Sequence, residues 1–543
     1  MQSKLFRGYR IETKRTRFNI ASLVVLTLYM SCIPPKTTPT VEPAELVVPI
    51  TEMTDVYEPT WESLAKSEIP EWLKDAKFGV YTHWGIYSVI AKGGAGAPLK
   101  SIYKKGRGKL ATYEHYLKNF GKAEDFGYVD IIPMFTAEKF DAEEWVGVMA
   151  DAGAKFGGIC VVHHDGFLLW DSKVNRWNSM NMGPKRDIFG EIARAVRARG
   201  DMKLAATFHH GRTYGFATGN KLDEWTAEEK AKFDLFDPHY KDFYWHDGHS
   251  SRKEFSEEWR AKVVEVVDNY QPDFIWFDGL NTSIKNDTPP ESFIQDAIAH
   301  FLNKAARNGQ DGVVANKHAG KFNFPEEFGL LSYENGRQMP EDIGPWFLID
   351  RAIGYPWAWE EGKKYRDGAD YHIKSLIDLV SRGGIFLLSL TPRGDGSIPE
   401  REKEIMAGIG EWLDENGEAI YATRPWKIYG EGPNMNLTAM KKSASGKPKM
   451  GWNYRKKFTQ EDIRFTQSKD GKVLYAVTLA CPKKEKILIK SLRKGSEYYQ
   501  GDIKRISMLG YAADLEWIRT DIGLEISIPA GQSAKIACAY RIE

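Results

Sequence analysis

The sequence predicts an α/β protein, a (β/α)8-like TIM barrel followed by a C-terminal antiparallel β-sandwich. Two observations support this prediction. Between about Trp61 and Trp426, short apolar runs alternate with amphipathic helical segments, which is the pattern of a parallel sheet with crossover helices. After Trp426 the pattern changes to short alternating segments separated by Gly, Lys and Asp turns, which is typical of antiparallel strands. We therefore predict a barrel domain over residues 61–426 and a sandwich domain over residues 427–543.

The first 60 residues are not expected to belong to this fold. Residues 18–30 form an apolar run that is too short for the roughly 20 residues of a membrane-spanning helix but typical of a signal-peptide core. We interpret residues 1–32 as a signal peptide and the Pro/Thr-rich residues 33–60 as a tether. The segment ending at Cys32 resembles a bacterial lipobox, in which the cysteine is lipidated. We expect an exported protein, either secreted or a periplasmic or cell-surface lipoprotein whose only membrane contact is a lipid anchor at Cys32.

Seven apolar runs predict buried strands in the barrel segment, at residues 76–84, 156–164, 203–210, 273–278, 312–317, 329–334 and 383–390. Apolar residues at spacings of three and four predict helices between several of them, at residues 142–153, 187–200, 256–270 and 370–383. An eight-stranded barrel then contains one further strand with a weak pattern. In the C-terminal segment, alternating patterns predict strands within residues 472–481, 485–492, 524–530 and 533–542.

The composition excludes some classes of partner. The formal net charge is +1, with acidic and basic residues nearly equal in number, so nothing in it indicates nucleic acid or an anionic surface. The 17 tryptophans favour a carbohydrate, because apolar sugar faces stack on indole, although most tryptophans fill cores. Three cysteines besides Cys32 are too few for a disulfide scaffold. Nothing in the sequence specifies an oligomeric state.

Nearly every predicted barrel strand ends in a titratable or hydrogen-bonding side chain. In a barrel, the carboxyl ends of the strands converge on one mouth, where catalytic groups lie. These strand-end residues are His83, His163, His164, His209, His210, Asp278, Lys317 and Glu334.

Each of the two carboxylates at these strand ends, Asp278 and Glu334, has two possible roles. Asp278 follows an aromatic strand and precedes Gly279, so it can be a nucleophile, or it can cap the following helix. Glu334 can be its partner acid, or it can pair with Arg337. Two carboxyl groups about 5–5.5 Å apart make a retaining glycosidase, and roughly 6.5–9.5 Å an inverting one.

The histidines also have two readings. They can bind a divalent metal, or as neutral imidazoles they can hydrogen-bond sugar hydroxyls. Adjacent histidines chelate poorly because successive strand residues face opposite ways, so we favour hydroxyl recognition, with no metal and no cofactor. By the same alternation, we expect His209 to be a core residue.

Five blocks of the chain resemble glycoside hydrolase family 29, the α-L-fucosidases. EWLKDAKFGVYTHWGIYSV (71–89) is similar to that family's KFGIFIHWGxYSVP block, and GAKFGGICVVHHDGFLLWDSK (153–173) to its AKYVVLTAKHHDGFxLWDSK block. GPKRDIFGEI (183–192), PDFIWFDG (272–279) and GEWLDENGEAIYATRPW (410–426) match further blocks in the same order.

The resemblance implies retaining, exo-acting hydrolysis of terminal α-L-fucosyl residues by double displacement. It makes Asp278 the nucleophile and Glu334 the acid/base, with Glu326 and Glu327 as alternatives for the acid/base. It further implies that a set of residues contacts the sugar, with Trp276 stacking beside the ring, Lys317 replacing an arginine and His210 lying where a tyrosine is common. These implied substrate-binding residues are His83, Glu114, His163, His164, His210, Trp276 and Lys317.

Departures from the family blocks leave other functions open. His115 replaces a tryptophan beside Glu114, and GGIFLLSLTP (383–392) departs from the usual GGNLLLNIGP. An apolar pocket cannot strongly reject one added hydroxyl, so an exo-α-L-galactosidase acting on the same ring is one alternative. A catalytically inactive sugar-binding homologue and a metal-dependent hydrolase are the others.

Overall fold

The computed structural model describes residues 55–543, apart from residues 107, 281–288, 319–323, 338, 341–342, 436, 443–447, 453 and 530–534. The predicted signal peptide, Cys32 and most of the tether lie outside the described residues. The last tether residues, 55–60, belong to the fold instead: the backbone N–H groups of Val56 and Tyr57 each donate to Asn303 Oδ1 at 2.9 Å. In the part of the chain that is described, no helix is long and apolar enough to cross a membrane.

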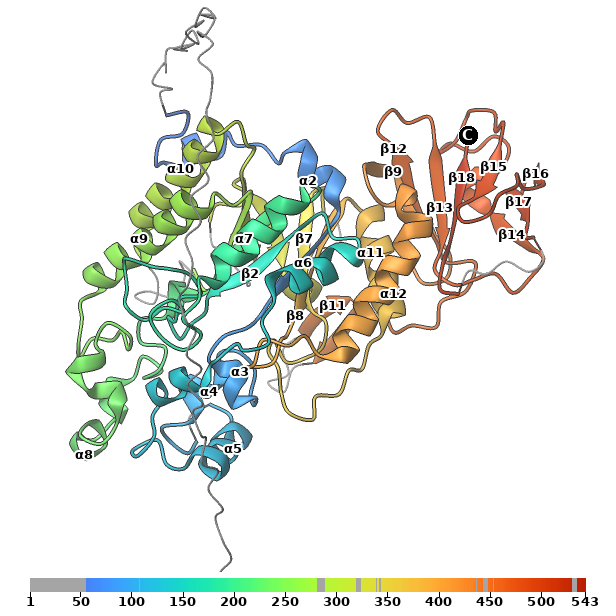
Figure 1. Cartoon of the computed structure of the whole chain (residues 1–543). Helices are drawn as coiled ribbons and strands as arrows, with labels where there is room; N and C mark the ends of the chain where they lie inside the picture. Colours follow the sequence, from blue (N-terminus) through green and yellow to red (C-terminus); the bar gives the residue numbers. More distant parts are fainter. Residues whose placement is uncertain are drawn as a thin grey trace, which may run out of the picture. The chain divides into compact units, whose positions relative to one another are not determined.

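Eight parallel strands close into a barrel in sequence order (Figure 1). They are β1 (Phe78–Thr82), β2 (Phe156–Val162), β3 (Lys203–Phe208), β4 (Phe274–Phe277), β5 (Val313–His318), β6 (Leu330–Tyr333), β7 (Phe347–Ala352) and β8 (Gly384–Leu390). All seven predicted strands are confirmed. The eighth, β7, has an apolar run of only three residues before Asp350 and Arg351, which explains its weak pattern.

Long helices lie outside the barrel (Figure 1). They are α6 (Ala142–Asp151), α7 (Ile188–Arg199), α9 (Arg252–Tyr270), α10 (Glu291–Arg307), α11 (Ala369–Ser381) and α12 (Glu400–Asn416). The four predicted helices correspond to α6, α7, α9 and α11. Local signals define their ends: Ser251 and Glu254 form a capping box at the start of α9, and Gly200 ends α7 in the left-handed conformation at φ 73°.

Further helices lie before β1 or in the connections between the barrel strands. They are α1 (Trp61–Leu64), α2 (Glu71–Ala76), α3 (Tyr87–Ile90), α4 (Ala97–Ser101), α5 (Leu110–Phe120) and α8 (Ala227–Lys230).

Alternate residues of each barrel strand face the interior. Tyr81, Ala205, Trp276, Ala315 and Leu348 belong to one buried cluster inside the barrel. Because strand side chains alternate, the residue two positions after each of these also faces inward, one step closer to the mouth. This alternation determines which of the residues at the strand ends reach the mouth of the barrel.

The C-terminal domain consists of antiparallel sheets, one of five strands in the order β15-β18-β13-β12-β9 and one of three in the order β14-β17-β16, with a separate two-stranded ribbon β10-β11. Both larger sheets contribute to one core, so the predicted sandwich is confirmed. The strands are β9 (Thr423–Glu431), β10 (Thr438–Lys442), β11 (Pro448–Trp452), β12 (Ile463–Ser468), β13 (Leu474–Thr478), β14 (Lys486–Ile489), β15 (Ile506–Met508), β16 (Trp517–Arg519), β17 (Leu524–Ser527) and β18 (Cys538–Ile542).

The predicted domain boundary at 426/427 is wrong by a few residues. It falls inside β9, which pairs with β12 from Thr423 onward. The change in composition at Trp426 comes after the chain has already entered the sandwich, because the first residues of β9 lack an alternating apolar pattern.

A buried ion pair joins the sandwich to the barrel. Arg464 of β12 contacts the carboxylate of Asp378 on α11, and both side chains are almost completely buried. Arg382 also pairs with Asp378, at 3.2 Å. Nearby, the Trp412 indole N–H of α12 donates to the Ala537 carbonyl at 3.0 Å.

We expect Arg464→Ala to destabilise the protein by about 3–5 kcal/mol, because it leaves the buried Asp378 carboxylate with less compensation. Arg505→Ala is the matched control, since Arg505 pairs with Asp514 where both side chains are exposed, and it is expected to cost no more than about 1 kcal/mol. Equilibrium unfolding in urea measures both. Equal effects of the two substitutions would show that this ion pair does not stabilise the domain contact.

Candidate active site

A cavity of about 300 Å³ opens at the carboxyl ends of the barrel strands. Side chains from seven of the eight strand ends line it, six of them strands whose end residues were predicted from the sequence, and the seventh β7. The polar residues from the strands are Tyr81, His83, His163, His164, His209, Trp276, Asp278, Lys317, Glu334 and Asp350. The connections after β1, β3 and β7 complete the wall.

Lys317 bridges two carboxylates in this cavity. Its Nζ lies 2.7 Å from Asp278 Oδ1 and 3.4 Å from Glu334 Oε2. The two oxygens are therefore no farther apart than the sum of these distances, which is less than the roughly 6.5–9.5 Å separation of an inverting pair. The arrangement agrees with the shorter spacing of a retaining pair.

The environment of Asp278 favours its ionised form. Burial opposes ionisation, but the Lys317 ammonium outweighs it and holds the pKa of Asp278 well below its usual range. The backbone N–H of Gly279 also donates to Asp278 Oδ1, at 2.8 Å. In turn, the neighbouring carboxylates raise the pKa of Lys317 although burial lowers it. The pair is thus a carboxylate and an ammonium at neutral pH.

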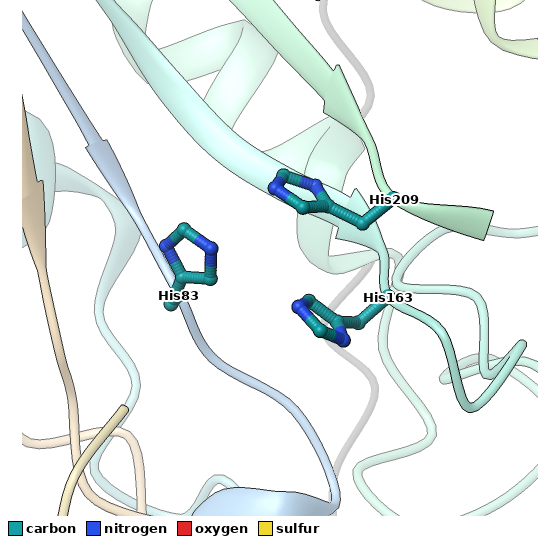
Figure 2. Close-up of side chains that lie close together, drawn as sticks. All are labelled: His83, His163 and His209. Atoms are coloured by element: carbon teal, nitrogen blue, oxygen red, sulfur yellow. The ribbon is translucent and has the colours of Figure 1, made fainter. Parts of the chain in front are cut away.

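Three buried imidazoles lie close together in the cavity (Figure 2). The ring centroids of His163 and His209 are 5.0 Å apart with nearly parallel planes, and His83 lies 5.0 Å from His209 and 5.7 Å from His163. Burial lowers the pKa of His83 to about 3 and those of the other two well below their usual value, so all three are neutral. One ring nitrogen from each lies within 4.8 Å of the others, a spacing that a metal ion or a set of hydroxyl groups can use.

Hydrogen bonds fix the orientation of two of these rings. His83 Nδ1 lies 2.8 Å from Ser389 Oγ, and His209 Nδ1 lies 3.1 Å from Cys160 Sγ. The Nε2 atoms of His83 and His209 can therefore hydrogen-bond to a ligand. His163 Nδ1 is buried and has no partner among the described residues.

His164 lies between the imidazoles and the carboxylates. Its Nδ1 contacts the carbonyl of His209, and its Nε2 is 3.9 Å from Asp278 Oδ2, too far for a direct hydrogen bond. Burial, only partly offset by Asp278, lowers its pKa to about 4, so the ring is neutral. A ligand hydroxyl can occupy the space between Nε2 and the carboxylate.

A strand irregularity brings both His163 and His164 to the cavity. The β2–β3 register shifts between Cys160 and Val162, so two residues of β2 stand opposite one of β3. This extra residue changes the phase of the interior-facing side chains just before the two histidines.

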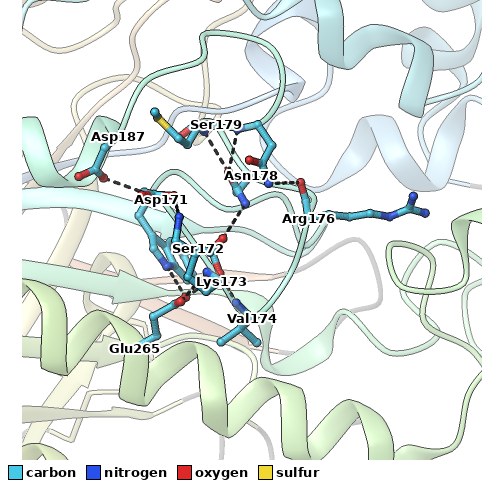
Figure 3. A network of polar contacts seen from close by, with 12 residues as sticks. Asp171, Ser172, Lys173, Val174, Arg176, Asn178, Ser179, Asp187 and Glu265 are labelled. Carbon is cyan, nitrogen blue, oxygen red and sulfur yellow. Dashed lines mark hydrogen bonds and ion pairs between the residues drawn. The ribbon is translucent and has the colours of Figure 1, made fainter.

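The WDSK segment (170–173) after these histidines anchors the loop and does not line the cavity (Figure 3). Glu265 of α9 accepts hydrogen bonds from Trp170 Nε1 at 2.8 Å, Ser172 Oγ at 2.6 Å and the Lys173 backbone N–H at 2.6 Å. Asp187, the N-cap of α7, accepts from the Asp171 backbone N–H at 3.2 Å. The loop that carries His163 and His164 is thereby tied to two outer helices.

The expectation for the second histidine pair is wrong. His209 lines the cavity, whereas His210 faces the outer helices and stacks on Trp259 at 5.7 Å between ring centroids. The reason is the strand phase, since Ala205 faces the barrel interior and His209 lies four residues later. His210, one residue further on, therefore points to the outside of the barrel.

The expected position of Glu114 is also wrong. Glu114 lies on α5, is exposed and does not line the cavity. Lys109 just before α5 lines it instead and donates to the Gly93 carbonyl at 2.5 Å. His115 Nε2 lies 2.9 Å from the Ile90 carbonyl oxygen, in the same connection after β1 as Gly93. The alternative acids Glu326 and Glu327 are exposed and outside the cavity lining.

Asp350 is a cavity residue that sequence reasoning missed. It lies on β7, two residues after the interior-facing Leu348, and is 1% exposed. Burial raises its pKa to about 7, with Lys317 opposing that rise. The signal that could have revealed it was the need for an eighth strand between Glu334 and residue 383.

Comparison with known proteins agrees with this geometry. A family model described as alpha-L-fucosidase matches residues 46–418, and one described as alpha-L-fucosidase C-terminal domain matches residues 455–542. This chain belongs to the α-L-fucosidase family, glycoside hydrolase family 29. The resemblance of the five sequence blocks is confirmed, and the chain is a glycoside hydrolase of the fucosidase type.

Relatives cover nearly the whole chain. The alpha-L-fucosidase of Branchiostoma floridae is 28% identical over 89% of this chain and 94% of that protein, and the tissue alpha-L-fucosidase of Homo sapiens is 29% identical over 87% and 88%. The crystal structure of Thermotoga maritima alpha-fucosidase in complex with fucose matches with a TM-score of 0.67 at 26% identity, covering 90% of this chain and all of that one. The fucosidase fold therefore includes both domains.

The two adjacent histidines provide a matched pair of substitutions. We expect His209→Phe to lower kcat/KM at least about tenfold, because it removes an imidazole from the fucosidase cavity, and His210→Phe to change it by less than about threefold. Hydrolysis of an aryl α-L-fucoside measures both. Equal losses in the two variants would contradict the assignment.

The His210 variant also has a stability signature. Burial holds the pKa of His210 well below 6.5, so below pH 6.5 the unfolded chain binds a proton that the folded protein does not. Acidification therefore destabilises the wild type, and between pH 7 and pH 5.5 His210→Phe should lose about 1.2 kcal/mol less stability in total. Urea unfolding at pH 7 and pH 5.5 tests this.

Proposed function

We propose that this member of the family is an exo-acting retaining α-L-fucosidase, with Asp278 as nucleophile and Glu334 as acid/base. The observation that supports this most strongly is the pair of carboxylates held on one buried ammonium, Lys317, at 2.7 Å and 3.4 Å. Asp278 is kept ionised, as a nucleophile requires. Glu334 has 27% of its side chain accessible, close to the 24% of Asp278, so it can reach the departing alcohol and then water.

The first displacement forms an ester between the sugar and the enzyme. An Asp278 oxygen attacks C1 of the terminal sugar, the bond from C1 to the glycosidic oxygen breaks, and Glu334 gives its proton to that oxygen. The second displacement reverses the roles: Glu334 takes a proton from water, the water oxygen attacks C1, and the ester bond to Asp278 breaks. Two inversions at C1 leave its configuration unchanged.

We propose that the neutral imidazoles of His83, His163, His164 and His209 bind the sugar hydroxyls. A neutral imidazole donates at one nitrogen and accepts at the other, so it matches a hydroxyl group whichever way its proton points. Ser389 and Cys160 already engage one nitrogen of His83 and His209, which directs the other to the ligand. Trp276 and Lys317 complete the contacts proposed from the family resemblance.

Substitution of the two carboxylates tests their roles. We expect Asp278→Ala to lose at least about a thousandfold in turnover of 4-nitrophenyl α-L-fucoside, since it removes the nucleophile. In Glu334→Ala, azide should restore turnover and yield a fucosyl azide of retained configuration, because azide attacks the glycosyl-enzyme ester. In Asp278→Ala, any azide product should have inverted configuration.

Two controls accompany this experiment. Glu326→Ala and Glu327→Ala remove exposed carboxylates outside the cavity and should yield no azide product. Chelation with EDTA should leave the wild-type rate unchanged, whereas a loss restored by added Zn²⁺ would favour a metal on the imidazole cluster. A wild type that binds L-fucose but does not turn over would favour the inactive homologue.

We also propose that the enzyme is exported and anchored through a lipid on Cys32. Residues 18–30 have the length and hydrophobicity of a signal-peptide core, and the residues that end at Cys32 resemble a lipobox. The Pro/Thr-rich residues that follow would hold the barrel away from the membrane.

Metabolic labelling with a fatty acid in a bacterial host tests the anchor. We expect label on the wild type and none on Cys32→Ser, with Cys481→Ser as the matched control that keeps its label. A protein that is released into the medium without label would favour the secreted form.

A further inference from the structure

The floor of the cavity carries polar atoms that the protein does not satisfy. The phenol oxygen of Tyr81, Nε1 of Trp276 and Oδ1 of Asp350 are buried and have no hydrogen-bond partner among the described residues. All three residues line the cavity, and we call them the polar floor. Since buried polar groups are normally hydrogen-bonded, we expect a polar group of the ligand to hydrogen-bond to the polar floor.

The order of the strands indicates which part of the sugar meets this floor. The four imidazoles come from β1 to β3, Asp278 from β4, and Lys317, Glu334 and Asp350 follow from β5 to β7. With C1 at Asp278, the hydroxyls on C2 to C4 extend in one direction around the ring and the ring oxygen and C5 in the other. If the imidazoles bind those hydroxyls, Asp350 faces C5 and its exocyclic carbon, C6.

Tyr81 lines the same cavity as Asp350. It lies two residues before His83 on β1, one layer deeper in the barrel, and its ring packs edge-on against Trp276 at 5.9 Å. Burial raises the pKa of Tyr81, and the negative charge of Asp350 raises it further. In the family block KFGIFIHWG, phenylalanine stands at this position, so the phenol hydroxyl is an addition in this chain.

L-Fucose carries a methyl group at C6, which offers no hydrogen bond, whereas L-galactose carries a hydroxyl there. We propose that Tyr81 and Asp350 bind a hydroxyl on C6, and that the enzyme hydrolyses α-L-galactosides in addition to α-L-fucosides. The reaction is the double displacement already described, so this inference rests on the proposed function. It assigns the floor residues as determinants of sugar specificity.

The chemistry of the two floor groups matches a hydroxyl. A hydroxyl donates one hydrogen bond and accepts others, and the Tyr81 phenol donates while the Asp350 carboxyl oxygen accepts. Burial raises the pKa of Asp350 to about 7, which reduces the charge that the closed end of the cavity must hold before the sugar arrives. A methyl group in the same place leaves both groups without partners.

The test is the ratio of kcat/KM for 4-nitrophenyl α-L-galactoside to that for 4-nitrophenyl α-L-fucoside. We expect the wild type to turn over both, and Tyr81→Phe to lower the ratio about tenfold or more, by weakening the galactoside reaction while the fucoside reaction stays constant or improves. Asp350→Asn should shift the ratio in the same direction, and the ratio cancels any effect on Lys317 shared by both sugars.

Tyr87→Phe is the matched control, because its phenol is also buried and without a partner among the described residues but does not line the cavity. It should leave the ratio unchanged. The inference is overturned if the wild type hydrolyses the fucoside and not the galactoside, or if Tyr81→Phe lowers both reactions equally. Failure of the proposed function is a different result, namely that neither sugar is hydrolysed by a folded wild type.

Discussion

The chemistry of this cavity depends on one buried ammonium, that of Lys317, among three carboxyl groups. Its side chain is 8% exposed, so its charge is poorly screened and must be balanced by the groups beside it. The ammonium does not interact equally with the three carboxyl groups. Asp278, at 2.7 Å, is held ionised; Glu334 lies at 3.4 Å with 27% of its side chain accessible; and burial raises the pKa of Asp350, the least exposed of the three. Beside the same cation, the pKa of Asp278 is therefore lowered, whereas burial raises that of Asp350.

The barrel makes this arrangement possible because it imposes a fixed alternation on every strand. Interior positions recur at every second residue, and the last interior position of each strand reaches the mouth. Cys160 pairs with Thr207 of β3, and His209, two residues after Thr207, contacts the Cys160 thiol, which orients an imidazole of the cavity. Where the alternation is interrupted, as in β2, two consecutive histidines reach the cavity. The site is therefore specified as much by backbone phase as by the identity of its side chains.

Most of the fold could be predicted from the sequence because seven barrel strands are continuous apolar runs, buried on both faces. Strand β7 could not, since Asp350 and Arg351 break its run, and a short apolar stretch with a charged pair looks like a loop. It was equally hard to predict which of two adjacent residues at a strand end faces the barrel interior. The choice between His209 and His210 depends on which residues of β3 face inward, and the apolar residues of that strand do not distinguish its two faces. Glu114 was placed by similarity to a family block, but the position of α5 depends on tertiary packing that such a block does not contain.

Asp350 also shows why a perturbed pKa alone does not identify the acid of a glycosidase. Its pKa near 7 would suit a general acid, and by that criterion it would be preferred to Glu334. The leaving alcohol, however, is the rest of the glycan and must depart toward solvent, so its proton donor has to lie near the mouth. Asp350 is 1% exposed and lies inside a strand, whereas Glu334 begins the turn after β6 and is partly accessible. Depth in the barrel therefore supports the proposal that Glu334 protonates the glycosidic oxygen and that Asp350 binds a hydroxyl at the far end of the sugar, where a group that can gain or lose a proton adds no fixed charge.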